Sequence, residues 1–361
     1  MKTFFFVLAL WMASLASVFA QTPPTIITQP QSYAVVAGSN LTVSVMVTGA
    51  PAPSLQWQFN GTNLPGDNLS TLTLNSMAVT QSGSYDVVVT NNFGSVTSSV
   101  ARLAAVTINK TWTGGGDGQS WSDANNWSGG TVPAANDSVF IGGTNGTIMV
   151  SGGLTISNLI CQRAITFNGS LNVSGAVDVG QSFYISIGNS ISVNGISAML
   201  IAEENTTVNA VNLYAGSGGL ISFPRLTQLN GGNYINTTIE AGPGAVLDLS
   251  SVQTLTGPTG AGWLDLNADA GAVLNLSGVT NLNGGNINAP GQGVNVNASA
   301  TNGVVNLSSL LNFYGFGNMN AANGGTILAP NLNYIYGVGL YVDGSSTLDL
   351  TGLTQISRPL P

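Results

Sequence analysis

The chain has 361 residues, of which 43% are apolar and only 6% are charged, and histidine is absent. This composition excludes a disordered acidic tail, and the length allows two bodies with separate cores. Acidic residues outnumber basic ones by 14 to 6, which predicts no binding to nucleic acid and disfavours anionic membranes. Without histidine, few groups remain for general acid–base catalysis.

Residues 1–20 have the pattern of a secretory signal. A lone basic residue, Lys2, precedes the apolar run Phe4–Met12, and small residues lead to Ala20. The run is short for a membrane span, and the polar, Pro-rich stretch that begins at Gln21 does not extend it. We expect cleavage after Ala20, no membrane span in the mature chain, and a secreted or cell-surface protein.

Residues 24–106 are predicted to form short alternating strands separated by Gly, Pro and Asn turns. Trp57 and Tyr85 stand at positions where this stretch resembles the immunoglobulin-like family, in the form common on bacterial secreted proteins. There they match the core tryptophan and the tyrosine corner of that fold. Val45 and Val87 occupy the places of the family's bridging cysteines. The resemblance therefore implies a sandwich in which apolar packing replaces the disulfide.

Residues 107–137 form a Gly-rich segment that contains Trp112, Trp121 and Trp127. The segment resembles the head of bacterial surface β-helix and autotransporter-passenger proteins, where similarly spaced tryptophans lead into the first coil. The resemblance implies a cap. A first coil exposes apolar edges and unpaired strand groups, and three indoles on a Gly-rich loop can cover them.

Two functional alternatives to the cap remain open for this segment. The three tryptophans could form a sugar-stacking platform, because aromatic faces pack against pyranose rings. Gly116 to Gly118, with Asp117 between them, and Asp123 could hold a calcium ion. We favour the cap, since large aromatic side chains are more often buried and Gly-Asp-Gly is ordinary turn chemistry. No metal or cofactor is predicted.

Residues 138–361 are predicted to form a parallel β-helix because a nine-residue phrase recurs. Its first, third, sixth and ninth positions are apolar, and successive phrases start 21 to 31 residues apart. This pattern predicts strand, bend and short strand in stacked coils. The phrases are ISFPRLTQL, LDLSSVQTL, LNLSGVTNL, VNLSSLLNF, ILAPNLNYI and LDLTGLTQI, which start at Ile221, Leu247, Leu274, Val305, Ile327 and Leu348.

Four apolar-polar-apolar triplets upstream resemble the start of this phrase at shorter spacings. They are 154–156, 171–173, 191–193 and 208–210. We expect an irregular first half of the solenoid, in which the sequence does not fix the number of coils.

Catalytic carboxylates are hard to pair in such a stack. The second phrase position points outward, and it places Asp248 and Asp349 four coils apart, roughly 19 Å at about 4.8 Å per coil. A glycosidase needs its two carboxyls about 5 to 9.5 Å apart. Asp265 and Asp269 are the best remaining acidic candidates, and Glu203 and Glu204 are expected on a loop or bulge.

The basic residues of the coils, Arg163, Arg225 and Arg358, have no acidic neighbour in sequence, so a lyase site is not evident. Cys161, in a strand-like apolar run, is predicted to be a buried residue rather than a nucleophile. Asn275 and Asn306 are expected to be neighbours in successive coils, where aligned amides can bond as a ladder. We predict no catalytic residue.

These observations predict an all-β chain with an immunoglobulin-like sandwich followed by a parallel β-helix. The predicted function is non-enzymatic: an adhesin-like or structural protein, secreted or on the cell surface, that binds extracellular polysaccharide or protein surfaces. A β-helix polysaccharide lyase or hydrolase is the alternative. An uncapped final coil would expose a strand edge, which leaves self-association through the solenoid ends open.

Overall fold

The computed structural model describes residues 21–143, 145–232, 234–285 and 291–357. The predicted secretory signal, residues 1–20, and Arg358 lie outside them. The described residues form strands and turns with three short 3-10 helices, as expected of an all-β chain. In the same ranges, no helix has the length and apolar character needed to cross a membrane.

The N-terminal domain is built from short, mostly antiparallel strands in three sheets. One sheet has the order β2-β10-β8-β5-β6 with β9 beside β8, and the pairs β1-β4 and β3-β7 form the others. The elements are β1 (Thr22–Thr28), β2 (Tyr33–Val36), β3 (Leu41–Ser44), β4 (Met46–Ala50), β5 (Ser54–Phe59), β6 (Thr62–Asn63), β7 (Thr71–Leu74), η1 (Val79–Gln81), β8 (Gly83–Asn91), β9 (Gly94–Thr97) and β10 (Ala101–Val106).

The core of this domain surrounds Trp57. Its side chain is fully buried, and its indole N–H donates to the Leu69 carbonyl at 2.9 Å. Val87 lies opposite Trp57 in the antiparallel pairing of β5 and β8. Val45, Val87 and Tyr85 are also buried. Apolar side chains therefore fill the two positions at which the resemblance implied a missing disulfide.

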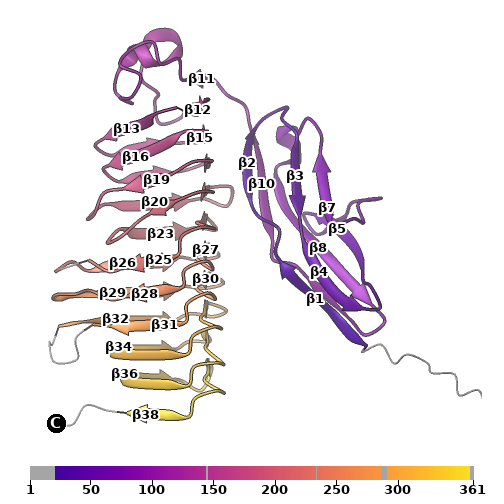
Figure 1. Cartoon of the computed structure of the whole chain (residues 1–361), viewed down its shortest axis with the longest axis vertical. Helices are drawn as coiled ribbons and strands as arrows, with labels where there is room; N and C mark the ends of the chain where they lie inside the picture. The colour runs from indigo at the N-terminus through magenta and orange to yellow at the C-terminus, as the bar shows by residue number, and fades with distance from the viewer. Residues whose placement is uncertain (1–20, 144, 233, 286–290, 358–361) are drawn as a thin grey trace, which may run out of the picture. The chain divides into compact units, whose positions relative to one another are not determined.

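The larger of the two compact units of the chain contains the residues from Arg102 onward, and here the strands stack in successive rungs (Figure 1). The first sheet of this solenoid pairs its strands in parallel throughout. Its strands are β11 (Lys110–Thr111), β12 (Ser138–Ile141), β15 (Asn158–Cys161), β18 (Ala176–Val179), β21 (Met199–Ala202), β24 (Leu220–Ser222), β27 (Val246–Asp248), β30 (Val273–Asn275), β33 (Val304–Asn306), β35 (Thr326–Leu328) and β37 (Thr347–Asp349).

Two further sheets close the coils. The second sheet contains β13 (Thr147–Ser151), β16 (Ala164–Asn168), β19 (Phe183–Ile185) and β22 (Thr206–Thr207). The third contains β14 (Leu154–Ile156), β17 (Leu171–Val173), β20 (Ser190–Asn194), β23 (Asn212–Gly216), β25 (Gln228–Asn230), β26 (Thr237–Ala241), β28 (Thr254–Thr256), β29 (Gly262–Ala268), β31 (Asn281–Gly284), β32 (Gln292–Ala298), β34 (Asn312–Ala321), β36 (Tyr334–Val342) and β38 (Gln355–Ser357).

The third sheet has two arms, which the long strand β34 joins. Its first part, Asn312–Gly315, pairs with β31, and its last part, Gly317–Ala321, pairs with β32. The arm through β32 continues back through β29 and β26 and forward into β36. This arm carries the candidate site described below.

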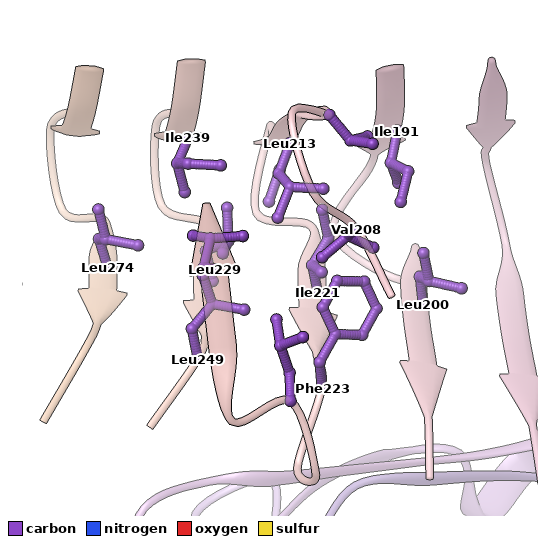
Figure 2. Close-up of a cluster of buried hydrophobic side chains, with 14 of the residues drawn as sticks. Ile191, Leu200, Val208, Leu213, Ile221, Phe223, Leu229, Ile239, Leu249 and Leu274 are labelled. Carbon is purple, nitrogen blue, oxygen red and sulfur yellow. The ribbon is translucent and has the colours of Figure 1, made fainter. Parts of the chain in front are cut away.

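All six phrases lie on strand, bend and strand, as predicted. In the third phrase, Leu274 is on β30, Leu282 is on β31, and the bend lies between them. Its four apolar positions, Leu274, Leu276, Val279 and Leu282, are completely buried. Figure 2 shows side chains from neighbouring coils, among them the register partners Leu200 and Ile221, gathered inside the solenoid.

The upstream triplets are not earlier copies of the phrase start, which corrects the sequence interpretation. Three of them are β14, β17 and the middle of β20, which belong to the third sheet, whereas the phrases begin on the first. Residues 208–210 lie in a turn. The physical reason is that every short strand of a coil buries alternate residues, so all three sheets produce the same apolar-polar-apolar triplet.

Candidate functional site

Two rows of outward-pointing residues cross β26, β29, β32, β34 and β36. They point outward because the residues between them, such as Leu266, Val296 and Met319, are completely buried. One row is Thr238, Asp265, Asn295, Asn318 and Gly339, and the other is Glu240, Asn267, Asn297, Asn320 and Tyr341. We call these two rows the amide face.

Hydrogen bonds along the stack order the side chains of the amide face. Asn295 Nδ2 donates to Asp265 Oδ1 at 2.8 Å, and Asn318 Nδ2 donates to Asn295 Oδ1 at 3.0 Å. In the second row, Asn297 Nδ2 donates to Asn267 Oδ1 at 2.8 Å. Each amide has two donors and two acceptor lone pairs, so these bonds fix its orientation and leave further groups for a ligand.

A groove of about 540 Å³ opens on the C-terminal part of the amide face. It is lined by Asn295, Asn297, Asn318, Met319, Asn320, Gly339, Leu340 and Tyr341. The buried Oδ1 atom of Asn320 has no hydrogen-bond partner, and the side chain of Tyr341 is 58% exposed. The groove therefore offers oriented amides and an accessible aromatic ring.

Gly339 lies beside the end of the amide ladder. A Cβ atom at this position would meet the Oδ1 atom of Asn318, so a larger residue would shift that amide.

The acidic candidates Asp265 and Asp269 lie on and just after β29, near the amide face. Asp265 accepts the ladder bond from Asn295, whereas Asp269 lies just beyond the end of β29. Burial, together with the negative charge of Asp269, raises the pKa of Glu240. Asp269 thus acts electrostatically on Glu240, a partner that sequence spacing could not indicate.

Two acidic residues of the first sheet, Asp248 and Asp349, stabilise bends. Asp248 and Asp349 are separated by four strand steps, which confirms the predicted separation. Asp248 Oδ1 accepts the Ser250 N–H at 3.2 Å, and Asp349 Oδ1 accepts the Thr351 N–H at 3.2 Å. These carboxylates therefore hold the turn that follows each strand.

Arg225 has an acidic partner that its sequence neighbourhood did not reveal. Its guanidinium lies 3.5 Å from a carboxylate oxygen of Glu204, and both side chains are substantially exposed. An exposed pair of this kind contributes little to stability, typically about 0–1 kcal/mol.

The three tryptophans of the cap segment, which also contains η2 (Ala124–Asn126) and η3 (Ser128–Gly130), form one aromatic cluster. The ring of Trp127 lies edge-on to Trp112 and Trp121, at centroid distances of 4.8 and 4.7 Å. Its indole N–H donates to the Trp121 carbonyl at 2.7 Å. Trp121 and Trp127 are buried in the solenoid core, and Trp112 packs against it half-buried. This burial leaves no open platform on Trp121 or Trp127 for stacking a sugar.

Arg163 ties the cap segment to the first coils. Its guanidinium carbon lies 5.7 Å from the centre of the Trp112 ring. The same group donates to the carbonyls of Gly118 and Gly146 at 3.3 Å. A buried cation over an indole stabilises this junction. Arg163 therefore makes structural contacts rather than an ion pair with an acidic residue.

The carboxylates proposed as calcium ligands are used in local hydrogen bonds. Asp117 Oδ1 accepts the Gln119 N–H at 2.9 Å and the Asn126 Nδ2 at 2.7 Å. Asp123 accepts the backbone N–H groups of Asp117 and Asn125 at 2.9 and 3.0 Å. Contacts of this kind stabilise turns. No group of three or more acidic or Cys side chains able to hold a metal occurs in the described ranges.

Cys161 is buried on β15, as predicted. Burial is the main cause that raises the pKa of its thiol to about 12, so little thiolate is present at neutral pH.

Sequence reasoning did not find the amide face. Its signal is a polar-apolar-polar triplet between the phrases: Asp265-Leu266-Asn267, Asn295-Val296-Asn297 and Asn318-Met319-Asn320. The first two triplets are 30 residues apart and the last two are 23 apart. This irregular spacing hides the repeat.

The comparisons with known proteins bear on part of the chain. The Immunoglobulin domain family matches residues 23–91, so the N-terminal domain is immunoglobulin-like. Endoglucanase C of Cellulomonas fimi is 34% identical over 100 residues, which are 26% of this chain and 9% of that protein. The chain thus spans less than a tenth of the length of this curated relative.

Among solved structures, a chimeric titin Z1Z2 protein functionalized with an exogenous decorin peptide is 30% identical and covers 25% of this chain and 99% of its own, with a TM-score of 0.23. The titin M4 domain is 26% identical and covers 24% of this chain and 100% of its own, also with a TM-score of 0.23.

Proposed function

We propose that the chain is a non-enzymatic protein, secreted or on the cell surface, that binds extracellular polysaccharide through the amide face. The observation that carries the proposal is the groove on this face, in which oriented Asn side chains lie beside the exposed ring of Tyr341. The similarity of 100 residues to Endoglucanase C supports a carbohydrate-related role.

The chemistry of the groove suits sugar hydroxyl groups. A hydroxyl both donates and accepts hydrogen bonds, and an Asn amide answers both needs. Asn295, Asn297 and Asn320 line the groove, where their amides can bond to sugar hydroxyls. The exposed Tyr341 ring can pack against the apolar face of a pyranose.

The groove is poorly suited to cleaving a polysaccharide. Among its described lining residues there is no Asp, Glu, Lys or Arg, so neither an acid pair nor a basic proton acceptor is at hand. The neighbouring carboxylate Asp265 is engaged by Asn295. Binding therefore accounts for the geometry better than the β-helix lyase or hydrolase alternative.

The test is a glycan-array screen of residues 21–361, followed by calorimetric titration of the best-bound polysaccharide. Asn320→Ala and Tyr341→Ala are each expected to weaken binding about tenfold, since each removes one ligand contact. Matched controls are Asn306→Asp, at a position where Asp248 and Asp349 already make the same turn bond, and Tyr184→Ala, on the second sheet. Both controls should bind like the unmodified chain.

The same mixtures are then followed for new reducing ends and unsaturated sugars. Binding without products supports the proposal. Turnover would overturn the non-enzymatic part, and a chain that binds no glycan, or binds equally well after both groove substitutions, would overturn the binding site.

A further inference from the structure

We infer that the polysaccharide on the amide face is electrically neutral and lies along the stack of coils, across successive strands. The inference rests on the proposed function and names the ligand class and its direction. Two independent features carry it: the distribution of charge over the C-terminal coils, and the repetition of the amide rows from strand to strand.

The C-terminal coils contain acidic residues but no basic ones. Between Arg225 and Arg358 the sequence has no Lys or Arg. The same stretch contains six carboxylates: Glu240, Asp248, Asp265, Asp269, Asp343 and Asp349. A surface with charges of one sign repels a polymer of the same sign. Uronate and sulfate groups would find no cation on these coils, so the field selects against acidic glycans.

Two carboxylates at the N-terminal end of the amide face, on β26 and β29, strengthen the selection against acidic glycans. Asp265 belongs to the same row as Asn295 and Asn318, and Glu240 heads the row of Asn297 and Asn320. A polymer that extends from the groove toward β29 and β26 therefore meets carboxylates directly. A neutral chain can donate hydrogen bonds from its hydroxyls to those carboxylate oxygens, whereas an acidic chain is repelled.

The direction of the polymer follows from the alignment of Asn side chains on neighbouring strands. Asn297 and Asn320 are partners on neighbouring strands, about 4.8 Å apart along the stack. The groove takes its lining from β32, β34 and β36, so its length crosses strands. A ligand along this axis meets Asn267 on β29, paired Asn side chains on β32 and β34, and the Tyr341 ring on β36, and successive sugars of one chain can use them.

The first experiment compares the best-bound neutral hexose polymer with the same polymer after oxidation of its C6 hydroxyls to carboxylates. The oxidised form is expected to bind at least tenfold more weakly at low salt. The difference should shrink at about 0.5 M salt, where the screening length falls to a few ångströms. Equal binding of both polymers, or an acidic glycan as the best array ligand, would overturn the neutral class.

A variant that gains binding distinguishes an effect of charge on affinity from a loss of affinity through damage to the fold. Asn318→Lys places a cation on the exposed row of the groove, and it should raise affinity for the oxidised polymer about fivefold or more. Gln253→Lys adds the same charge at an exposed position outside the groove and should leave that affinity unchanged. An equal gain in both variants would show only a change of net charge and would contradict selection by the amide face.

The direction is tested with oligosaccharides of increasing length from the best-bound polymer. Affinity should rise at least as far as the tetrasaccharide, because each added sugar reaches another rung. Saturation at the disaccharide would contradict a ligand along the stack. If no glycan of either kind binds, the proposed function itself fails; if acidic forms bind as well as neutral ones or better, only this inference fails.

Discussion

Asn side chains make different hydrogen bonds in different parts of this chain. On the first sheet, the Oδ1 atoms of Asn275 and Asn306 accept N–H groups two residues further on and hold the bend. On the amide face, Asn297 Nδ2 instead donates to Asn267 on the neighbouring strand β29, because Asn297 lies within β32 rather than at its end. Asn275 and Asn306 are register neighbours, as predicted, but the ladder bond of Asn275 runs to Asp248.

Glu240 gives a prediction at the residue scale. Because burial and Asp269 raise its pKa in the folded chain, the folded state holds a proton that the unfolded state has already released, and stability falls as pH rises from the unfolded pKa through the folded pKa. Glu240→Gln should therefore raise the melting temperature at pH 7 and change it little at pH 4. Melting curves at both pH values test this, and an equal shift at both would contradict it.

The elements of the solenoid were predictable where one sheet repeats and unpredictable where the corner between strands varies. The phrases gave the strand pairs from β24 onward because each places Leu, Val or Ile on the same inner face. The amide arm was not predicted because seven residues, 285–291, lie in sequence between β31 and β32, whereas one continuous strand, β34, pairs with both of them. Corners face solvent and tolerate insertions, so sequence period and coil period differ.

At the element scale, the cost of removing an inner side chain should depend on its coil. Leu274 lies inside the stack and is completely buried, so Leu274→Ala should cost about 2–5 kcal/mol of unfolding free energy. Leu348 occupies the same register position in the last first-sheet strand, and it is only half-buried. Leu348→Ala should cost less than half as much. Urea unfolding followed by circular dichroism measures both, and equal costs would contradict the expectation.

The two ends of the solenoid differ. The cap segment buries Trp121 and Trp127 in the core at the N-terminal end. At the other end, Leu340 and Val342 are 39% and 49% exposed, whereas their register partners Met319 and Ala321 are completely buried. These exposed apolar residues form the edge at which self-association remains a prediction.

At the scale of the whole molecule, this difference predicts a gradient of local stability. In a stacked array each coil is stabilised by its neighbours, so β36 and β38 should open more readily than β29 and β32. Native-state hydrogen exchange should show faster exchange in peptides from β36 and β38, by at least tenfold. Uniform protection from β29 to β38 would mean that another contact covers the last coil.

The amide ladder has a consequence for how such a surface can change. Because β32 and β34 carry the same Asn-x-Asn pairs in register, a duplication of one of these coils would lengthen the amide face without altering its chemistry, and a deletion would shorten it by the same step. The length of this surface therefore changes in steps of one coil. Related chains with different numbers of coils would bind different lengths of polymer through the same contacts within each coil.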